Sequence, residues 1–229
     1  MSASKPPVPA PAPAKSPEDA RQRLLMAGLR LFAQQGFSKT STRELAEAGH
    51  VNVAAISYYF GDKAGLYRAV FFEPLGAPED DIARYNGIDL SLEQALRGFY
   101  AGFMEPLKRG DEIRLCMKLH FREMLEPTGL WQAAVSHGIR PLHDALLVVL
   151  CRQLGLAQAD DDVLRLAICL AGLGVHMHTG RDINDQLAPG LLDGGPAIER
   201  MSEHLVMYAL AMVQAEQQRR HKTASDFNA

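Results

Sequence analysis

Histidine and carboxylate residues are the first candidates for chemistry in this sequence, because these side chains bind metals and transfer protons. His176 and His178 lie two positions apart in a helical pattern, so their side chains would point about 200° apart and are poorly placed to share one ion. His120 and Glu123 have a spacing found in metal-binding helical bundles, but the sequence offers no second pair of this kind to complete a site. We therefore predict no metal and no cofactor.

Catalytic motifs are also missing from the sequence. It contains no glycine-rich phosphate loop and none of the patterns HExxH, GxSxG and CxxC. Cys116, Cys151 and Cys169 are odd in number, widely spaced and embedded in apolar helical patterns, which indicates reduced core thiols and a cytoplasmic protein. We expect a protein that is not an enzyme.

A different kind of chemistry is indicated by residues 41–63, STRELAEAGHVNVAAISYYFGDK. Ser41 and Glu44 have the spacing of a capping box, which predicts a helix that begins near Thr42. A short turn follows that helix, and Asn52 is then a second candidate N-cap. The stretch is therefore predicted to form two short helices joined by a tight turn.

The second of these helices has two unlike faces. Three apolar residues recur at spacings of three and four, which is typical of a buried face: Val53, Ile56 and Phe60. The other face carries small or hydrogen-bonding residues: Ala54, Ala55, Ser57, Tyr58 and Tyr59. Such a surface can enter a DNA major groove and contact base edges or phosphates. Lys63 at the end of this helix, and the polar cluster at residues 38–43, are predicted to contact phosphates.

The order of these features resembles the DNA-binding domain of the TetR family of bacterial transcription regulators. The similarity covers about residues 18–72 and rests on the motifs TRELA and VNVAAISYYFGDK and on the preceding pair GF. His50 departs from the family pattern, which usually has glycine before the turn valine, and histidine adopts the left-handed conformation at some cost. The resemblance implies a helix-turn-helix bound to a double-stranded DNA operator. The predicted DNA-contacting residues are Thr40, Thr42, Arg43, Asn52, Val53, Ala54, Ala55, Ser57, Tyr58, Tyr59 and Lys63.

Length and charge agree with this interpretation. The chain has 229 residues, 47% of them hydrophobic, and a formal net charge of −3, which allows a sizeable core. Residues 1–72 carry nine Lys/Arg against five Asp/Glu, whereas the remainder carries 15 against 22, and this asymmetry suits an N-terminal polyanion site. No run of 18 uncharged apolar residues is present, and the start of the chain lacks the apolar centre of a signal peptide, so we predict no membrane partner.

An all-α protein with two folded domains is predicted, because no strand pattern emerges. Residues 1–15 are predicted to be a disordered Pro/Ala-rich tail, residues 16–72 a helix-turn-helix domain, and residues 88–220 a helical regulatory and dimerisation domain. Residues 79–87 are interpreted as a linker or exposed loop, and residues 180–195 as an irregular stretch. The helices predicted in the second domain cover residues 91–108, 111–126, 130–154, 160–177 and 196–220.

Two apolar stripes on the last helix indicate that it packs on its own domain and on a partner chain, as in helix-bundle dimers. The helix before it carries small residues that permit close approach. The alternative is a bundle packed wholly within one chain. The resemblance also implies a dimer through the last two long helices, and residues 92–219 are similar to the CecR (YbiH-like) subgroup. The predicted interface residues are Ala167, Ala171, Gly174, Met201, Leu205, Tyr208 and Met212.

Aromatic, Met and His side chains on the second domain's helices indicate a ligand cavity, although the same mixture suits an ordinary core. The candidate pocket residues are Phe99, Phe103, Met117, His120, Phe121, Met124, Trp131, His137 and His176. The resulting hypothesis is a homodimeric, nucleoid-associated repressor that a small-molecule effector of unknown identity releases from a palindromic operator. The alternative is a helix-turn-helix regulator whose second domain binds a protein partner and no small ligand.

Overall fold

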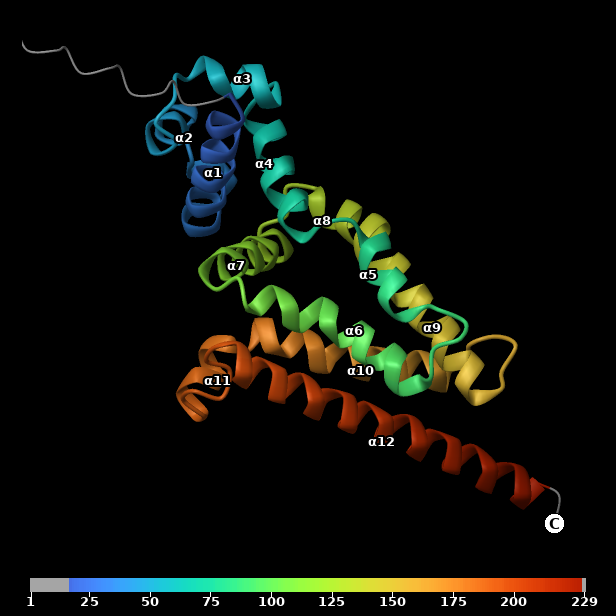
Figure 1. Ribbon diagram of the computed structural model, residues 1–229. Helices are drawn as coiled ribbons and strands as arrows, with labels where there is room; N and C mark the ends of the chain where they lie inside the picture. The colour runs from blue at the N-terminus through green and yellow to red at the C-terminus, as the bar shows by residue number, and fades with distance from the viewer. Residues whose placement is uncertain (1–16, 228–229) are drawn as a thin grey trace, which may run out of the picture. The chain divides into compact units, whose positions relative to one another are not determined.

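The computed structural model describes residues 17–227 of the chain. Every regular element within that range is a helix, which confirms the predicted all-α class (Figure 1). The tail predicted over residues 1–15 lies outside the described residues. The chain divides into two compact units, Met1–Val70 and Phe71–Ala229, and the boundary falls inside one helix, α4 (Lys63–Phe72).

The first unit has an aromatic core. Its helices are α1 (Pro17–Lys39), α2 (Thr42–Ala48), α3 (Ala54–Phe60) and most of α4. Gly36 breaks α1 with a φ of 82°, and Phe37 follows it. Phe32 packs edge to face on Tyr67 with ring centroids 4.9 Å apart, and Phe37 lies 5.0 Å from the same ring. This cluster fixes the end of α1 against the start of α4.

The linker or loop predicted over residues 79–87 is wrong, because helix α5 (Pro78–Tyr85) occupies most of it, after a 3₁₀ turn at Glu73–Leu75. Pro78 has the φ that a first helical turn requires, and the three acids after it favour the positive end of the helix dipole. Tyr85 at its end is buried and donates a hydrogen bond to the Leu142 carbonyl at 2.7 Å. The glycines and prolines around the helix concealed this amphipathic segment.

The rest of the second unit is a helical bundle. Its elements are α6 (Leu92–Leu107), α7 (Asp111–Leu125), α8 (Leu130–Ala134), the π-helical segment η2 (Val135–Ile139), α9 (Arg140–Leu154), α10 (Asp161–Thr179), α11 (Arg181–Leu187) and α12 (Gly195–Phe227). α6 lies within the bundle, where α5, α9, α10 and α12 pack on it, and α12 runs along α6 and α10 (Figure 1). Tyr100 on α6 is buried and donates to the Leu170 carbonyl on α10 at 3.0 Å.

The end of the chain differs from the prediction in two places. The stretch over residues 180–195 contains helix α11, and α12 continues to Phe227 instead of ending near Arg220. Arg220 donates to both carboxylate oxygens of Asp160 at 2.8 and 2.7 Å, and it also pairs with Glu216. The pair with Asp160 ties α12 to the start of α10, so the polar end of α12 is held by a partner that is remote in sequence.

No single helix in the described part of the chain has the length and apolar character needed to cross a membrane. α10 and α11 meet that requirement only when they are taken together, and they are bent by 76° at their junction.

Candidate nucleic-acid interface and ligand pocket

The helix-turn-helix begins with a complete capping box, which confirms that prediction. The Ser41 hydroxyl accepts from the Glu44 amide at 3.2 Å, and the Glu44 carboxylate accepts from the Ser41 amide at 2.8 Å. The Ser41 amide is the main reason that the pKa of Glu44 lies below its usual value. The start of α2 is therefore set by local sequence alone.

The turn between α2 and α3 keeps its tight geometry without glycine at position 50. His50 has a φ of 52°, which is the left-handed region, and its amide donates to the Glu47 carbonyl at 3.0 Å. The Val51 amide then donates to the Ala46 carbonyl at 2.9 Å. Asn52 accepts from the Ala54 amide at 2.9 Å and so begins α3 through its side chain.

α3 is anchored by one fully buried side chain, and its other side chains are exposed or half-buried. Ile56 is buried, whereas Val53 is exposed although the spacing predicted it on the same buried face. Tyr58 is 80% exposed, and its ring lies 4.8 Å from that of Tyr59 in an edge-to-face pair. Ala54 and Ser57 are exposed and Ala55 is half-buried. α3 thus offers a small, hydrogen-bonding and aromatic surface that suits a major groove.

Two of the predicted DNA contacts have structural partners within the first unit. The Lys63 ammonium donates to the carbonyls of Phe37 and Thr40 at 3.0 and 2.9 Å, and lies 4.3 Å from the centre of the Phe37 ring. Thr40 is buried and its hydroxyl donates to the Gly36 carbonyl at 2.7 Å. Lys63 therefore ties the start of α4 to the chain between α1 and α2. Thr42 and Arg43 are exposed at the start of α2.

In the second unit, the residues predicted to form a ligand pocket are dispersed. Phe99 and Phe103 pack together with ring centroids 5.3 Å apart, whereas Met124, His137 and His176 are exposed. The side chains of Phe121 and Trp131 are half-buried. Of the nine candidates, only Met117 is among the residues that line the pocket described below.

His120 and Glu123 are buried for a structural reason. The His120 ring stacks on Phe71 at 3.9 Å between centroids, and burial lowers its pKa. Glu123 accepts from the amide and hydroxyl of Thr128 at 2.7 and 3.0 Å and from the Leu130 amide at 3.0 Å. This carboxylate holds the turn between α7 and α8. Among the described residues, no three His, Cys, Asp or Glu side chains are grouped to hold a metal ion.

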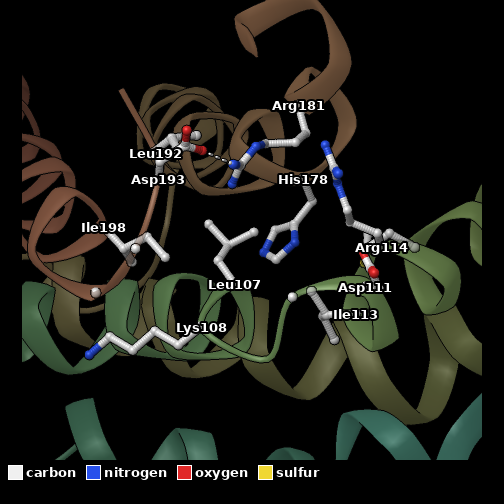
Figure 2. Close-up of a pocket in the computed structure, with 14 residues that line it drawn as sticks. Leu107, Lys108, Asp111, Ile113, Arg114, His178, Arg181, Leu192, Asp193 and Ile198 are labelled. Carbon is white, nitrogen blue, oxygen red and sulfur yellow. Dashed lines mark hydrogen bonds and ion pairs between the residues drawn. The ribbon is translucent and has the colours of Figure 1, made fainter. Parts of the chain in front are cut away.

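A pocket of about 390 Å³ lies between the α6–α7 turn, the α10–α11 junction and the start of α12 (Figure 2). Its apolar lining consists of Leu107, Ile113, Met117, Leu192 and Ile198, and its polar lining includes Lys108, Asp111, Arg114, His178, Arg181 and Asp193. Sequence reasoning missed all of these except Met117. No local motif marks them, because they come from separate segments that only the fold brings together.

Ion pairs organise the polar side of the pocket. Arg181 donates from Nε to Asp185 at 2.9 Å and from Nη2 to Asp193 at 3.1 Å, and Arg114 also binds Asp185 at 2.9 Å. His178 contacts the Phe103 carbonyl through Nε2 at 2.8 Å, so Nε2 carries the proton, and its buried Nδ1 has no hydrogen-bond partner in the described structure. Burial lowers the pKa of His178, which favours the neutral imidazole.

The residues predicted at a dimer interface divide into buried and exposed groups. Ala167, Gly174 and Leu205 are buried within the protomer, and a methyl group on Gly174 would lie 2.6 Å from the Phe103 ring. Ala171, Met201 and Met212 are half-buried, and Tyr208 is exposed. Large apolar side chains that remain exposed on the same two helices are Leu164, Ile168 and Val175 on α10 and Met207 on α12. Three of the seven predicted positions are thus covered within the protomer, and the predicted dimer interface stays a prediction.

Comparison with known proteins matches both units. The family model of bacterial regulatory proteins of the tetR family matches residues 24–70, and that of the C-terminal domain of the HTH-type transcriptional dual regulator CecR matches residues 92–215, more than half of the chain. CecR of Shigella flexneri is 26% identical over 176 residues, covering 72% of this chain and 78% of that protein.

Two further proteins are similar to this chain. The HTH-type transcriptional repressor AcnR of Corynebacterium glutamicum is 27% identical over 147 residues, covering 64% of this chain and 72% of that protein. The crystal structure of HlyIIR, a hemolysin II transcriptional regulator, superposes with a TM-score of 0.55 at 22% identity, covering 83% of this chain and 99% of that one. At this identity the superposition shows a shared fold.

Proposed function

Because the chain belongs to the TetR family of bacterial regulatory proteins and carries a C-terminal domain of the CecR type, we propose that this DNA-binding transcriptional regulator is a homodimeric repressor that a small molecule releases from its operator. The outward surface of α3 is the observation that carries the proposal. Ile56 fixes the helix while Ser57 and Tyr58 face outward, as base recognition requires. Its site of action is chromosomal DNA in the cytoplasm.

Repression is supported by AcnR, whose name describes a repressor, whereas CecR is named a dual regulator. A dimer is supported by the exposed apolar side chains of α10 and α12. These two helices pack on each other, so Ile168, Val175 and Met207 can form one surface for a second copy of the chain. A twofold dimer would place two α3 helices on half-sites of a palindrome about one DNA turn apart.

Effector control is supported by the pocket in the second unit, since a cavity of about 390 Å³ with apolar and polar sides suits a small molecule. Release from DNA requires that the effector bind the DNA-incompetent state more tightly. Bound effector must then lower the affinity for the operator by the same factor by which bound operator lowers the affinity for the effector.

Selection of bound fragments from genomic DNA tests the proposal, followed by affinity measurements on a selected site. The parent chain should enrich an inverted repeat. Tyr58→Ala should weaken binding to that site by about tenfold, since one aromatic or base contact contributes about 1–3 kcal/mol, and should leave stability unchanged because the side chain is exposed. Ile88→Ala, at an exposed position in the second unit, is the control.

Enrichment without sequence preference, or an unaffected Tyr58→Ala variant, would contradict recognition by α3. If the operator is bound but no small molecule alters its affinity, a second domain that recruits a protein partner replaces the effector mechanism.

A further inference from the structure

We propose that the pocket beside Arg181 binds a small apolar monocarboxylate, and that Asp193 occupies the position of the ligand's carboxylate when the pocket is empty. The identification of this ligand as the effector rests on the proposed function. The binding site itself follows from the contacts around Arg181.

One side of the pocket is apolar, which suits the hydrocarbon part of a ligand and not its charged group. Leu107, Ile113, Leu192 and Ile198 are all buried, and they come from α6, α7, the α11–α12 loop and α12. Met117 adds an adaptable side chain on the next turn of α7. A hydrocarbon chain or aromatic ring of the ligand would gain from leaving water here.

The cation that faces this apolar side is Arg181. Its side chain is only 16% exposed, and Figure 2 shows it beside His178 and Leu107, paired with Asp193. The neutral form of His178 adds no competing positive charge. Arg114 and Lys108 also line the pocket but are more exposed, and each pairs with two carboxylates outside the apolar lining. Arg181 is therefore the group that would anchor an anion, through a planar fork that matches a carboxylate.

The two carboxylates on Arg181 differ in how firmly they are held. Asp185 lies on α11 and binds both Arg181 and Arg114, so it links α11 to α7. Asp193 lies in the loop before α12, is 71% exposed, and its only ion pair within the described structure is with Arg181 at 3.1 Å. An exposed pair of this kind is weak. A carboxylate brought in by an apolar ligand can thus replace Asp193 without disturbing Asp185.

Calorimetric titration of the full chain tests the site, with octanoate and 4-phenylbutanoate as probes and their primary amides as matched neutral compounds. The carboxylates should bind at least about tenfold more tightly than the amides, since a charge-assisted bidentate pair is lost in the amide. Arg181→Gln should remove this preference, and Arg181→Lys should retain part of it. Circular dichroism establishes that both variants are folded.

The decisive variant is Asp193→Asn, which removes the internal competitor at an exposed position. It should tighten octanoate binding severalfold, whereas a merely structural ion pair would predict weaker or unchanged binding. Asp182→Asn is the matched control, because Asp182 is exposed and its ion pair in the described part of the chain is with Arg114. Its octanoate affinity should equal that of the parent.

The proposal is overturned if amides bind as tightly as carboxylates, if neither class binds, or if Asp193→Asn weakens octanoate binding or leaves it unchanged. These titrations contain no DNA, so their outcome is separate from that of the proposed function. If octanoate binds and Asp193→Asn tightens that binding, the carboxylate site is supported. If octanoate at the same time leaves operator affinity unchanged, this site is not the effector site.

Discussion

Lys63 illustrates how a residue can be located correctly by sequence while its contacts are not foreseen. Its place after the recognition helix predicts a phosphate contact, and that remains a prediction. The structure gives its ammonium the carbonyls of Phe37 and Thr40, which no local pattern indicates because they lie more than 20 residues earlier. One N–H of the ammonium is left for a phosphate.

Lys63→Ala should therefore destabilise the protein as well as weaken DNA binding. Two carbonyls lose a charged donor, so we expect the free energy of unfolding to fall by about 1–3 kcal/mol in denaturant titration. Lys39→Ala, at an exposed position in the same unit, should leave stability unchanged. An unaltered free energy of unfolding in Lys63→Ala, with a salt dependence of DNA binding reduced by about one phosphate, would show that the lysine serves DNA alone.

At the scale of elements, helices with local signals were predictable and helices without them were not. The capping box at Ser41 was predicted correctly, because its hydrogen-bonding groups lie within three residues of each other. α5 and α11 were missed, since the glycines and prolines around them resemble loop composition and their stability comes from packing on other helices. The pocket was missed because its lining comes from separate segments that only the fold brings together.

The ion pair between Arg220 on α12 and Asp160 at the start of α10 predicts that the stability of the fold depends on pH. The hydrogen bond from Arg220 holds the pKa of Asp160 well below its usual value of 3.8 in the folded protein. A depressed folded-state pKa contributes stability that is present above the unfolded-state pKa and is lost as pH falls through the folded value. Stability should thus decline as pH is lowered below about 4, by no more than about 1 kcal/mol from this exposed pair.

Asp160→Asn isolates the charge, because asparagine can still accept from the Asp162 and Val163 amides as an N-cap. Unfolding midpoints measured between pH 3 and 7 should show a smaller acid-induced decline in this variant than in the parent. The control is Asp161→Asn, whose side chain is exposed and pairs only within α10. An identical decline in all three proteins would show that the Arg220–Asp160 ion pair does not cause the loss of stability in acid.

At the scale of the whole molecule, the exposed apolar side chains show which substitution can test dimerisation without unfolding the protomer. Leu205 is 3% exposed, so Leu205→Glu would disrupt the protomer itself. Ile168 is 64% exposed on α10. Ile168→Glu should leave the protomer folded, shift sedimentation from dimer to monomer, and reduce operator affinity, because each subunit would then bind a half-site alone.

Ile88→Glu provides the matched control. Ile88 is 81% exposed and lies between α5 and α6, outside the two helices of the proposed interface. It should sediment like the parent. An Ile168→Glu variant that remains dimeric at the same concentration would assign the dimer to another surface.

The turn held by Glu123 also gives the protein a built-in optical probe. Trp131, the only tryptophan in the sequence, lies on α8 directly after Leu130, whose amide binds that carboxylate. Its emission therefore responds to the second unit, whereas the first unit has no such chromophore. Unfolding curves followed by tryptophan fluorescence and by circular dichroism will coincide only if both units melt together.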